Sequence, residues 1–517
     1  MVRESIILGT GILIITNFLV KILSLVYRGV LIRLIGSEGL GLSEMIMPLF
    51  SFLLVIASLG IPLAISNLIS ADIKREKYMT IFKTGLYMLL LNGVIVTLVA
   101  LLLYPVITEY IFTDSRLYLA FLFFFPSVIL ITVFSAFRGY FQGSHQSSQI
   151  GKSQAVEQIV RVVVGIALVY FLLQRNFPLS VLIAGLSAAT FFAEFAGGAY
   201  LWRRFSQENK GKKERGHFSP AIAKDFLKMG SPLTFSRIFT TLAISCQAIL
   251  IPKALVLSGY SLSEAASLYG YFSGVAITVL HLPAIVTSAI TTPLIPAVAE
   301  AQEQHNTKLL HKRIRDSIIF TSYTAVPMLA FIFYFATPIC DILFSAQEAG
   351  PMLSLFCLGG ILLYLQQPIV AVLQGLNYFK QLLLCLFIGD GAYIIMLFAC
   401  YLRQDFTIEM GIIAFIINDI ILLTSYIILL KRKTGVKMGL IRNTLFPLFY
   451  SLAGLCVTYI LKQHLNITEL NITAILCFGV VFMLIYFIGL LIFDRKNLAL
   501  FSRVSPRQRR RQNRQAL

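Results

Sequence analysis

The stretch IILGTGILIITNFLVKILSLVYRGVLI, residues 6–32, decides the fold class of this chain. It is apolar over more than the roughly 20 residues that an α-helix needs to cross a bilayer. It is also too long for the apolar core of a signal peptide, which has about 7–15 residues. We therefore interpret this stretch as the first membrane-spanning helix, and two cations, Lys21 and Arg28, lie inside it.

The composition of the whole chain agrees with this interpretation. Of the 517 residues, 57% are hydrophobic and 13% are charged, whereas soluble domains carry about 25% charged residues. The apolar runs are longer and more continuous than the alternating segments of about 10 residues found in membrane barrels. The sequence therefore predicts an all-α polytopic membrane protein. It contains no Walker A loop and no paired cysteine spacing, so we expect neither an enzyme nor a bound cofactor or metal.

We count fourteen apolar segments of spanning length, and their loop charges support the count. If the N-terminus and every second connection are placed on one side, that side holds about three-quarters of the 43 Lys and Arg residues. By the positive-inside rule, we expect a multi-pass membrane protein with both termini in the cytoplasm. The predicted spans are 6–32, 42–70, 82–104, 117–136, 155–173, 178–201, 230–252, 267–298, 317–340, 352–374, 381–402, 410–430, 444–461 and 472–493.

The two halves of the chain resemble each other weakly, at an offset of about 232 residues. The matching features are Pro62-Leu63 with Pro293-Leu294, Gly39 with Gly270, Gln142-Gly143 with Gln374-Gly375, and Glu157 with Asp390. Repeats of six helices insert the same way up, so we expect two parallel bundles around a central cavity. The predicted domains are a bundle over 1–201, a basic cytoplasmic loop with an interfacial helix over 202–229, a second bundle over 230–430, two further spans over 431–493 and a basic cytoplasmic tail over 494–517.

Four cations lie within the predicted spans, namely Lys21, Arg28, Arg161 and Arg237. A cation at the bilayer centre costs about 2.5–3.5 kcal/mol on insertion scales, so we expect these side chains to face a polar interior. Lys21 and Arg28 lie two helical turns apart on one face and could hold a diphosphate. Alternatively, a structural partner such as Glu44 neutralises one of them. Arg237 has no acid within one turn and is a further candidate for contacting an anion.

Five other polar residues are predicted to support the site. Glu157 and Arg161 are spaced for an intrahelical ion pair, and a structural pairing is the favoured interpretation. Arg138 ends the fourth span, where topology alone could explain it. Glu44 and Asp390 are carboxylates within spans. No two carboxylates form an evident acid/base pair.

Several short motifs carry a resemblance to a known family. They are Phe137-Arg138-Gly139-Tyr140-Phe141-Gln142-Gly143 with Gln154, Glu157-Gln158 and Arg161, then the stretch from Lys21 to Arg28 with Arg33-Leu-Ile-Gly36, and Gly60-Ile-Pro62-Leu-Ala-Ile-Ser66. Together they resemble the polysaccharide transporters of the MOP exporter superfamily, especially the stage V sporulation protein B group. Relatives usually carry a proline between Gly143 and Gln154, and this chain does not.

This resemblance implies a flippase that moves an undecaprenyl-diphosphate-linked, lipid II-like cell-wall precursor outward, with an association to spore cortex peptidoglycan. It also implies that Lys21 and Arg28 line the lumen. The expected partners are the lipid-linked oligosaccharide, membrane lipids and cell-wall synthesis enzymes, with Na⁺ or H⁺ as the coupling ion and no nucleic acid. Two alternatives stay open: a cation-coupled drug antiporter of the same superfamily, and a non-transporting membrane scaffold for cell-wall synthesis.

Overall fold

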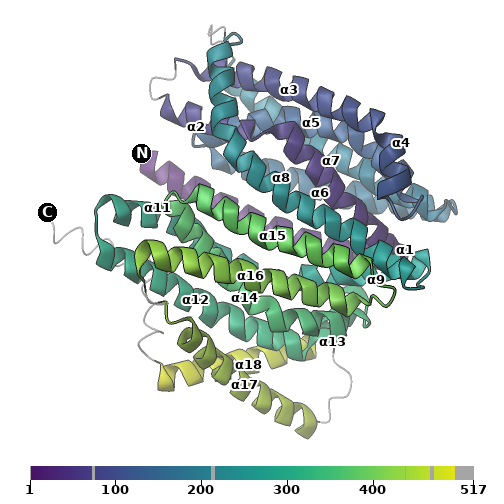
Figure 1. Ribbon diagram of the computed structural model, residues 1–517, viewed down its shortest axis with the longest axis vertical. Coiled ribbons are helices and arrows are strands. Elements are labelled where there is room, and N and C mark those ends of the chain that lie inside the picture. Colours follow the sequence, from purple (N-terminus) through teal and green to yellow (C-terminus); the bar gives the residue numbers. More distant parts are fainter. Residues whose placement is uncertain (1, 73–75, 211–215, 437, 466–470, 495–517) are drawn as a thin grey trace. The chain divides into compact units, whose positions relative to one another are not determined.

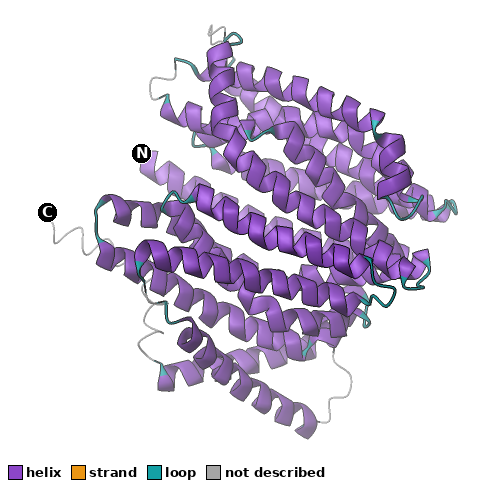
Figure 2. Cartoon of the chain, in the orientation of Figure 1, coloured by secondary structure: helices purple, strands orange, loops and turns teal. Residues whose placement is uncertain are grey.

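The computed structural model describes residues 2–72, 76–210, 216–436, 438–465 and 471–494, and every regular element in these ranges is a helix (Figure 2). The predicted basic tail beyond Asp494 and residues 211–215 of the predicted basic loop lie outside the described residues. The helices follow the apolar segments of the sequence closely, because a backbone in lipid must satisfy its own hydrogen bonds.

Most of the elements are labelled in Figure 1. In chain order they are α1 (Val2–Ser58), α2 (Ile61–Ala71), α3 (Tyr78–Leu102), α4 (Tyr104–Val106), η1 (Ile107–Ile111), α5 (Leu117–Gly143), α6 (Ser147–Gln174), α7 (Leu179–Glu208), α8 (Pro220–Leu257), α9 (Leu262–Tyr269), η2 (Gly270–Ile277), α10 (Thr278–Leu280), α11 (Ala284–Glu303), α12 (Thr307–Tyr334), α13 (Ala336–Phe344), α14 (Ala349–Gly375), α15 (Phe379–Tyr401), α16 (Ile408–Thr434), α17 (Leu440–His464) and α18 (Ile472–Phe493).

Twelve helices in the described ranges are long and apolar enough to cross a membrane. One of them, α1, contains the first predicted span and the beginning of the second, which continues in α2. Gly36 separates the two segments of α1 with a φ of 72°, a conformation that favours glycine. The predicted eighth span is divided among α9, η2, α10 and α11. With α1 counted as two segments and α9–α11 as one more, the helices agree with the fourteen predicted spans.

The chain forms two compact units. The first contains Met1–Gly274 and Asp390–Gly411, and the second contains Val275–Gly389 and Ile412–Leu517. The domain boundaries that we inferred from the sequence repeat remain predictions.

The core of the first unit is aromatic and β-branched, and it is built from α2, α3, α5, α7 and α8. Phe82 packs edge-to-face against Phe137 and in a tilted arrangement against Phe205, with ring centroids 5.0 Å and 4.4 Å apart, respectively. Ile65 and Phe226 are fully buried in the same cluster. This core holds the adjoining parts of α5 and α7 against α2, and it thereby fixes the helices that carry the charged residues described below.

One predicted element takes a different form. The helix predicted to begin at Ser219-Pro220 and to lie in the interface does begin at Pro220, but it continues without a break to Leu257 as α8. Its residue Phe226 is buried in the aromatic core rather than turned to lipid headgroups. Ile222 also packs against this core, whereas Leu227 and Met229 are exposed. The segment is therefore the first part of α8 and not a separate helix, and its location in the membrane interface remains a prediction.

The second unit has one large apolar core and a smaller cluster of tyrosines. The large core joins α11, α12, α14 and α16. In the smaller cluster, the Tyr486 hydroxyl donates to the Tyr323 carbonyl at 2.9 Å, and the Tyr323 hydroxyl donates to the Asp494 carboxylate. Tyr450 packs beside Tyr486, with ring centroids 6.5 Å apart. These contacts attach α17 and α18, which lie side by side in Figure 1, to α12.

Candidate substrate site in the first unit

Close backbone packing of α5 on α2 positions the first group of charges. A Cβ atom at Gly139 would lie 2.5 Å from the Pro62 carbonyl oxygen, and one at Gly143 would lie 2.6 Å from the Ser66 carbonyl oxygen. The Ser70 hydroxyl donates to the Gly143 carbonyl at 3.0 Å across the same contact. Small residues four apart allow two membrane helices to approach in this way. These glycines of the Phe137–Gly143 motif therefore set the position of Arg138.

Arg138 belongs to a cluster of four charges from three helices, which we call the four-charge cluster: Arg138 of α5, Glu157 and Arg161 of α6, and Glu194 of α7. The Arg138 guanidinium donates to Glu157 and to Glu194, both at 3.0 Å. The Arg161 guanidinium donates to the same two carboxylates at 2.8 Å and 3.2 Å. Each charge therefore contacts both charges of opposite sign, and the cluster is formally neutral.

The two carboxylates of the four-charge cluster are largely removed from solvent, whereas the Arg138 and Arg161 side chains are 27% and 22% exposed. The Glu194 side chain is 8% exposed and the Glu157 side chain 13%. The Nε atoms of Arg138 and Arg161 are buried and make no hydrogen bond within the described residues. Charges in such a place persist only when they are paired and hydrogen-bonded. We conclude that these paired charges join α5, α6 and α7 to one another.

The structure shows what three of the predicted residues contact. The Glu157–Arg161 ion pair is present, as the favoured interpretation held. Arg138 is not merely a topology signal, because it pairs with two carboxylates. Glu194 was not among the predicted site residues. Glu194 lies within a predicted span, as Arg161 does. A carboxylate in such a place needs a cation as a partner, and this requirement could have identified it.

A second polar group surrounds Arg28 of α1. The Arg28 guanidinium lies 2.9 Å from the Glu44 carboxylate, which follows it on α1 beyond the break at Gly36. The Ser273 hydroxyl of η2 donates to Glu44 at 3.3 Å, and Arg28 also reaches the Gly274 carbonyl at 3.5 Å. The alternative in which Glu44 neutralises Arg28 is thus the arrangement in this structure. The Arg28 side chain is nevertheless 32% exposed, so the pair is accessible.

Lys21 and Arg237 differ from these paired residues. Both side chains are exposed, and in the described part of the chain neither takes part in an ion pair or a side-chain hydrogen bond. They lie on α1 and α8, two helices that pack against each other in the first unit. One turn beyond Arg237, the Thr240 hydroxyl donates to Asp390 at 3.0 Å. Of the four cations within the predicted spans, Lys21 and Arg237 are therefore the two without an ion-pair partner among the described residues.

The four-charge cluster is not repeated in the second half of the chain. Asp390 occupies the place that corresponds to Glu157, but residues 369–371 and 392–394, which correspond to Arg138 and Arg161, are uncharged. The two halves share a helical pattern without sharing this polar interior. Among the described residues, no group of three His, Cys, Asp or Glu side chains could hold a metal ion.

Comparisons with known proteins match this architecture. The family model described as polysaccharide biosynthesis protein matches residues 6–302. Stage V sporulation protein B of Bacillus subtilis is 28% identical over 434 residues, which cover 82% of this chain and 83% of that protein. Lipid II flippase MurJ of the same organism is 24% identical over 414 residues, which cover 74% of each protein.

A solved structure agrees with these sequence matches. The structure of lipid II flippase MurJ in its inward closed conformation has a TM-score of 0.71 at 16% identity, and the match covers 95% of this chain and all of that one. This likeness shows the fold. The helices that are long and apolar enough to cross a membrane make the chain a multi-pass membrane protein. Because the family model spans more than half of the chain, the protein belongs to the polysaccharide biosynthesis protein family.

Proposed function

We propose that this transporter is a flippase that carries an undecaprenyl-diphosphate-linked cell-wall precursor from the cytoplasmic to the outer face of the bacterial cell membrane. The observation that supports it most is the pair of cations, Lys21 and Arg237, which are exposed within membrane-spanning helices and have no ion-pair partner among the described residues. Leaving two cations in lipid would cost about 5 kcal/mol. An anionic headgroup would remove that cost.

A diphosphate is the anion that suits these residues best. It presents several acceptor oxygens, which match the three donors of a lysine and the fork of an arginine. The sugar would occupy the polar interior with the diphosphate, and the prenyl chain would remain in lipid. The similarity to stage V sporulation protein B and to lipid II flippase supports a lipid II-like cargo, and the first of these relatives makes a role in sporulation part of the proposal.

The direction of transport follows from charge. With both termini in the cytoplasm, an inside-negative potential drives an anionic headgroup outward with about 2.3 kcal/mol per charge for each 100 mV. A gradient of Na⁺ or H⁺ would be an additional source of energy.

In the Arg28–Glu44 pair, the carboxylate would compete with the diphosphate for Arg28. We expect the Glu44→Gln variant to bind the diphosphate about tenfold more tightly. In this variant, Arg28 would no longer have to break an ion pair with a carboxylate in order to bind phosphate. Binding of undecaprenyl diphosphate to the purified variants would measure this effect. Glu300→Gln, which removes a carboxylate from the Arg313 pair in the second unit, is the matched control. Unchanged or weaker binding by Glu44→Gln would exclude the covering role.

Transport in proteoliposomes tests the proposed function. The purified chain would be reconstituted with fluorescent lipid II, with other polyprenyl-diphosphate sugars and, separately, with a cationic dye. An imposed potential or an ion gradient would supply the driving force. We expect the labelled headgroup to become accessible on the opposite face only when the protein is present, and we expect no transport of the dye. Dye transport without headgroup movement would instead support the drug antiporter, and the absence of both would support the scaffold.

A further inference from the structure

A short segment between α3 and α5 lies at one end of the first unit, and we call it the strap. It comprises α4, η1 and the turn that follows, residues 104–116. Two contacts hold the strap on α5. The Tyr104 hydroxyl donates to the Tyr118 carbonyl at 3.1 Å, and the rings of Phe112 and Phe121 have centroids 5.2 Å apart. By the predicted topology, the strap lies at the outer surface of the membrane.

An arginine with two carboxylate partners joins the end of the strap to α1. The Arg116 guanidinium donates to Asp114 of the strap and to Glu38 of α1, both at 2.6 Å. Glu38 lies just beyond the break of α1 at Gly36. The Asp114 side chain is 5% exposed, whereas the Arg116 side chain is 30% exposed. All of these residues belong to the predicted first bundle, so this ion pair fixes the strap to its own bundle.

A lysine joins the strap to α8. The Lys253 ammonium donates to the backbone carbonyl of Tyr110 at 2.5 Å. Tyr110 lies in the last turn of η1, where the carbonyl oxygens of a helix attract a cation. The Tyr110 side chain is 68% exposed, so the contact depends on its backbone alone. Lys253 belongs to the predicted second bundle but lies in the same compact unit as the strap. This hydrogen bond therefore connects the two predicted bundles.

Backbone packing also connects the predicted bundles at this end. Gly41 of α1 packs against the Ala266 carbonyl of α9, and Gly270 of η2 packs against the Ser37 carbonyl of α1. A Cβ atom at either glycine would collide with that oxygen. Small residues allow helices to approach in this way, and a glycine has no side chain that interlocks with its neighbour. The helices can therefore separate here without repacking these positions, whereas the Lys253 hydrogen bond must break.

We propose that Lys253 is a latch, whose hydrogen bond to the Tyr110 carbonyl holds the outer ends of the two predicted bundles together and breaks each time the protein opens outward. This inference rests on the proposed function, in which the cargo leaves on the outer side. One hydrogen bond from an ammonium group changes the ratio of closed to open molecules about tenfold, and it can still break in every transport cycle. Arg116 keeps the strap on α1 in both states.

Distances between two spin labels test the latch without any cargo. Tyr110→Cys keeps the backbone acceptor, and Leu257→Cys places the second label one turn beyond Lys253; both side chains are exposed. In the purified full-length chain, serine would first replace the cysteines that are not buried, namely Cys246, Cys400, Cys456 and Cys477. Pulsed electron–electron double resonance would then measure the populations at short and long distance. We expect Lys253→Gln to raise the ratio of long to short distances about tenfold.

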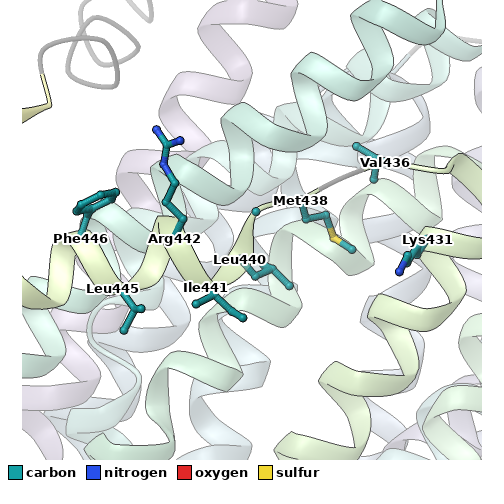
Figure 3. Close-up of a pocket in the computed structure, with 9 residues that line it drawn as sticks. Lys431, Val436, Met438, Leu440, Ile441, Arg442, Leu445 and Phe446 are labelled. Atoms are coloured by element: carbon teal, nitrogen blue, oxygen red, sulfur yellow. The ribbon is translucent and has the colours of Figure 1, made fainter.

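Two cations outside the strap provide matched controls. Arg175 follows α6 on the same predicted side of the membrane, and its guanidinium lies 5.4 Å from the centroid of the Phe171 ring. Arg442 of α17, shown with Phe446 in Figure 3, lies 5.8 Å from the centroid of that ring in the second unit. We expect Arg175→Gln and Arg442→Gln to leave the label distances unchanged. Unchanged distances in Lys253→Gln, or an equal shift in either control, would overturn the proposal.

A reversible cross-link separates the latch from the proposed function. A short bifunctional methanethiosulfonate would join the two introduced cysteines, and we expect headgroup translocation in proteoliposomes to stop until a reductant cleaves the link. The control cross-link joins Gln146→Cys to Glu208→Cys, whose native side chains meet at 3.3 Å between α6 and α7, and it should leave translocation unchanged. Normal translocation by the strap-linked protein would overturn the proposal. If the protein without a cross-link moves no headgroup, the proposed function fails, and the spin-label distances still decide whether Lys253 is a latch.

Discussion

Replacing Lys21 and Arg237 together with glutamine is expected to slow headgroup translocation at least about 100-fold when the cargo is below saturation. A hydrogen bond between a charged group and phosphate contributes about 1.5–3 kcal/mol, so each cation accounts for about 10- to 100-fold in affinity. The translocation rate should fall because the diphosphate binds more weakly and because its charge is no longer neutralised while it crosses the membrane. The initial rate of headgroup appearance outside proteoliposomes measures it.

Two controls make this result specific. Lys152→Gln removes one positive charge from an exposed position on α6, and we expect it to leave the rate unchanged. The thermal stability of the double variant should also match that of the unmodified protein, because neither Lys21 nor Arg237 has an ion-pair partner in the described ranges. A normal translocation rate in the double variant would remove these residues from the mechanism.

The four-charge cluster should affect stability rather than binding. Arg138→Gln leaves two buried carboxylates with one guanidinium, and Glu194→Gln leaves two guanidinium groups with one carboxylate. Breaking one side of a buried ion pair costs about 3–5 kcal/mol, so we expect each single variant to lower the free energy of unfolding by about this amount. Thermal or denaturant unfolding of the purified protein in detergent would measure the change.

The double variant Arg138→Gln with Glu194→Gln is the informative comparison. It keeps the Glu157–Arg161 pair at 2.8 Å and leaves no buried charge unmatched. We therefore expect the double variant to be more stable than either single variant. The interaction energy between the two substitutions would then be stabilising, whereas each substitution alone is destabilising. If the double variant lost as much stability as the two single variants combined, the cluster would not act as one neutral unit.

Much of this fold could be predicted because the bilayer restricts what a membrane-embedded chain can do. Long apolar runs and basic loops locate the spans, and both signals are local in sequence. The break at Gly36 and the division of residues 262–303 into four helices could not be predicted from hydropathy. Hydropathy averages over about 19 residues, whereas a glycine at positive φ or a π-helix changes the backbone over a few residues.

The charged residues were harder to predict than the helices. The Glu157–Arg161 pair was predictable because both residues lie on one helix, one turn apart. Arg138 and Glu194 contact this pair from two other helices, and the sequence contains no signal for which helices are neighbours. The same limitation applies to α8, where Phe226 lies on an amphipathic segment that fits a membrane surface and a protein core equally well. Only packing distinguishes the two.

In the proposed mechanism, unpaired cations within the spans bind the diphosphate of a lipid-linked cargo. The most direct measurement compares the affinities of the purified chain for undecaprenyl diphosphate and for undecaprenol, in the unmodified protein and in the Lys21→Gln, Arg237→Gln double variant. We predict that the unmodified protein prefers the diphosphate by at least about 100-fold and that the double variant loses most of this preference. Equal affinity for both lipids, or a preference that survives the loss of both cations, would contradict the claim.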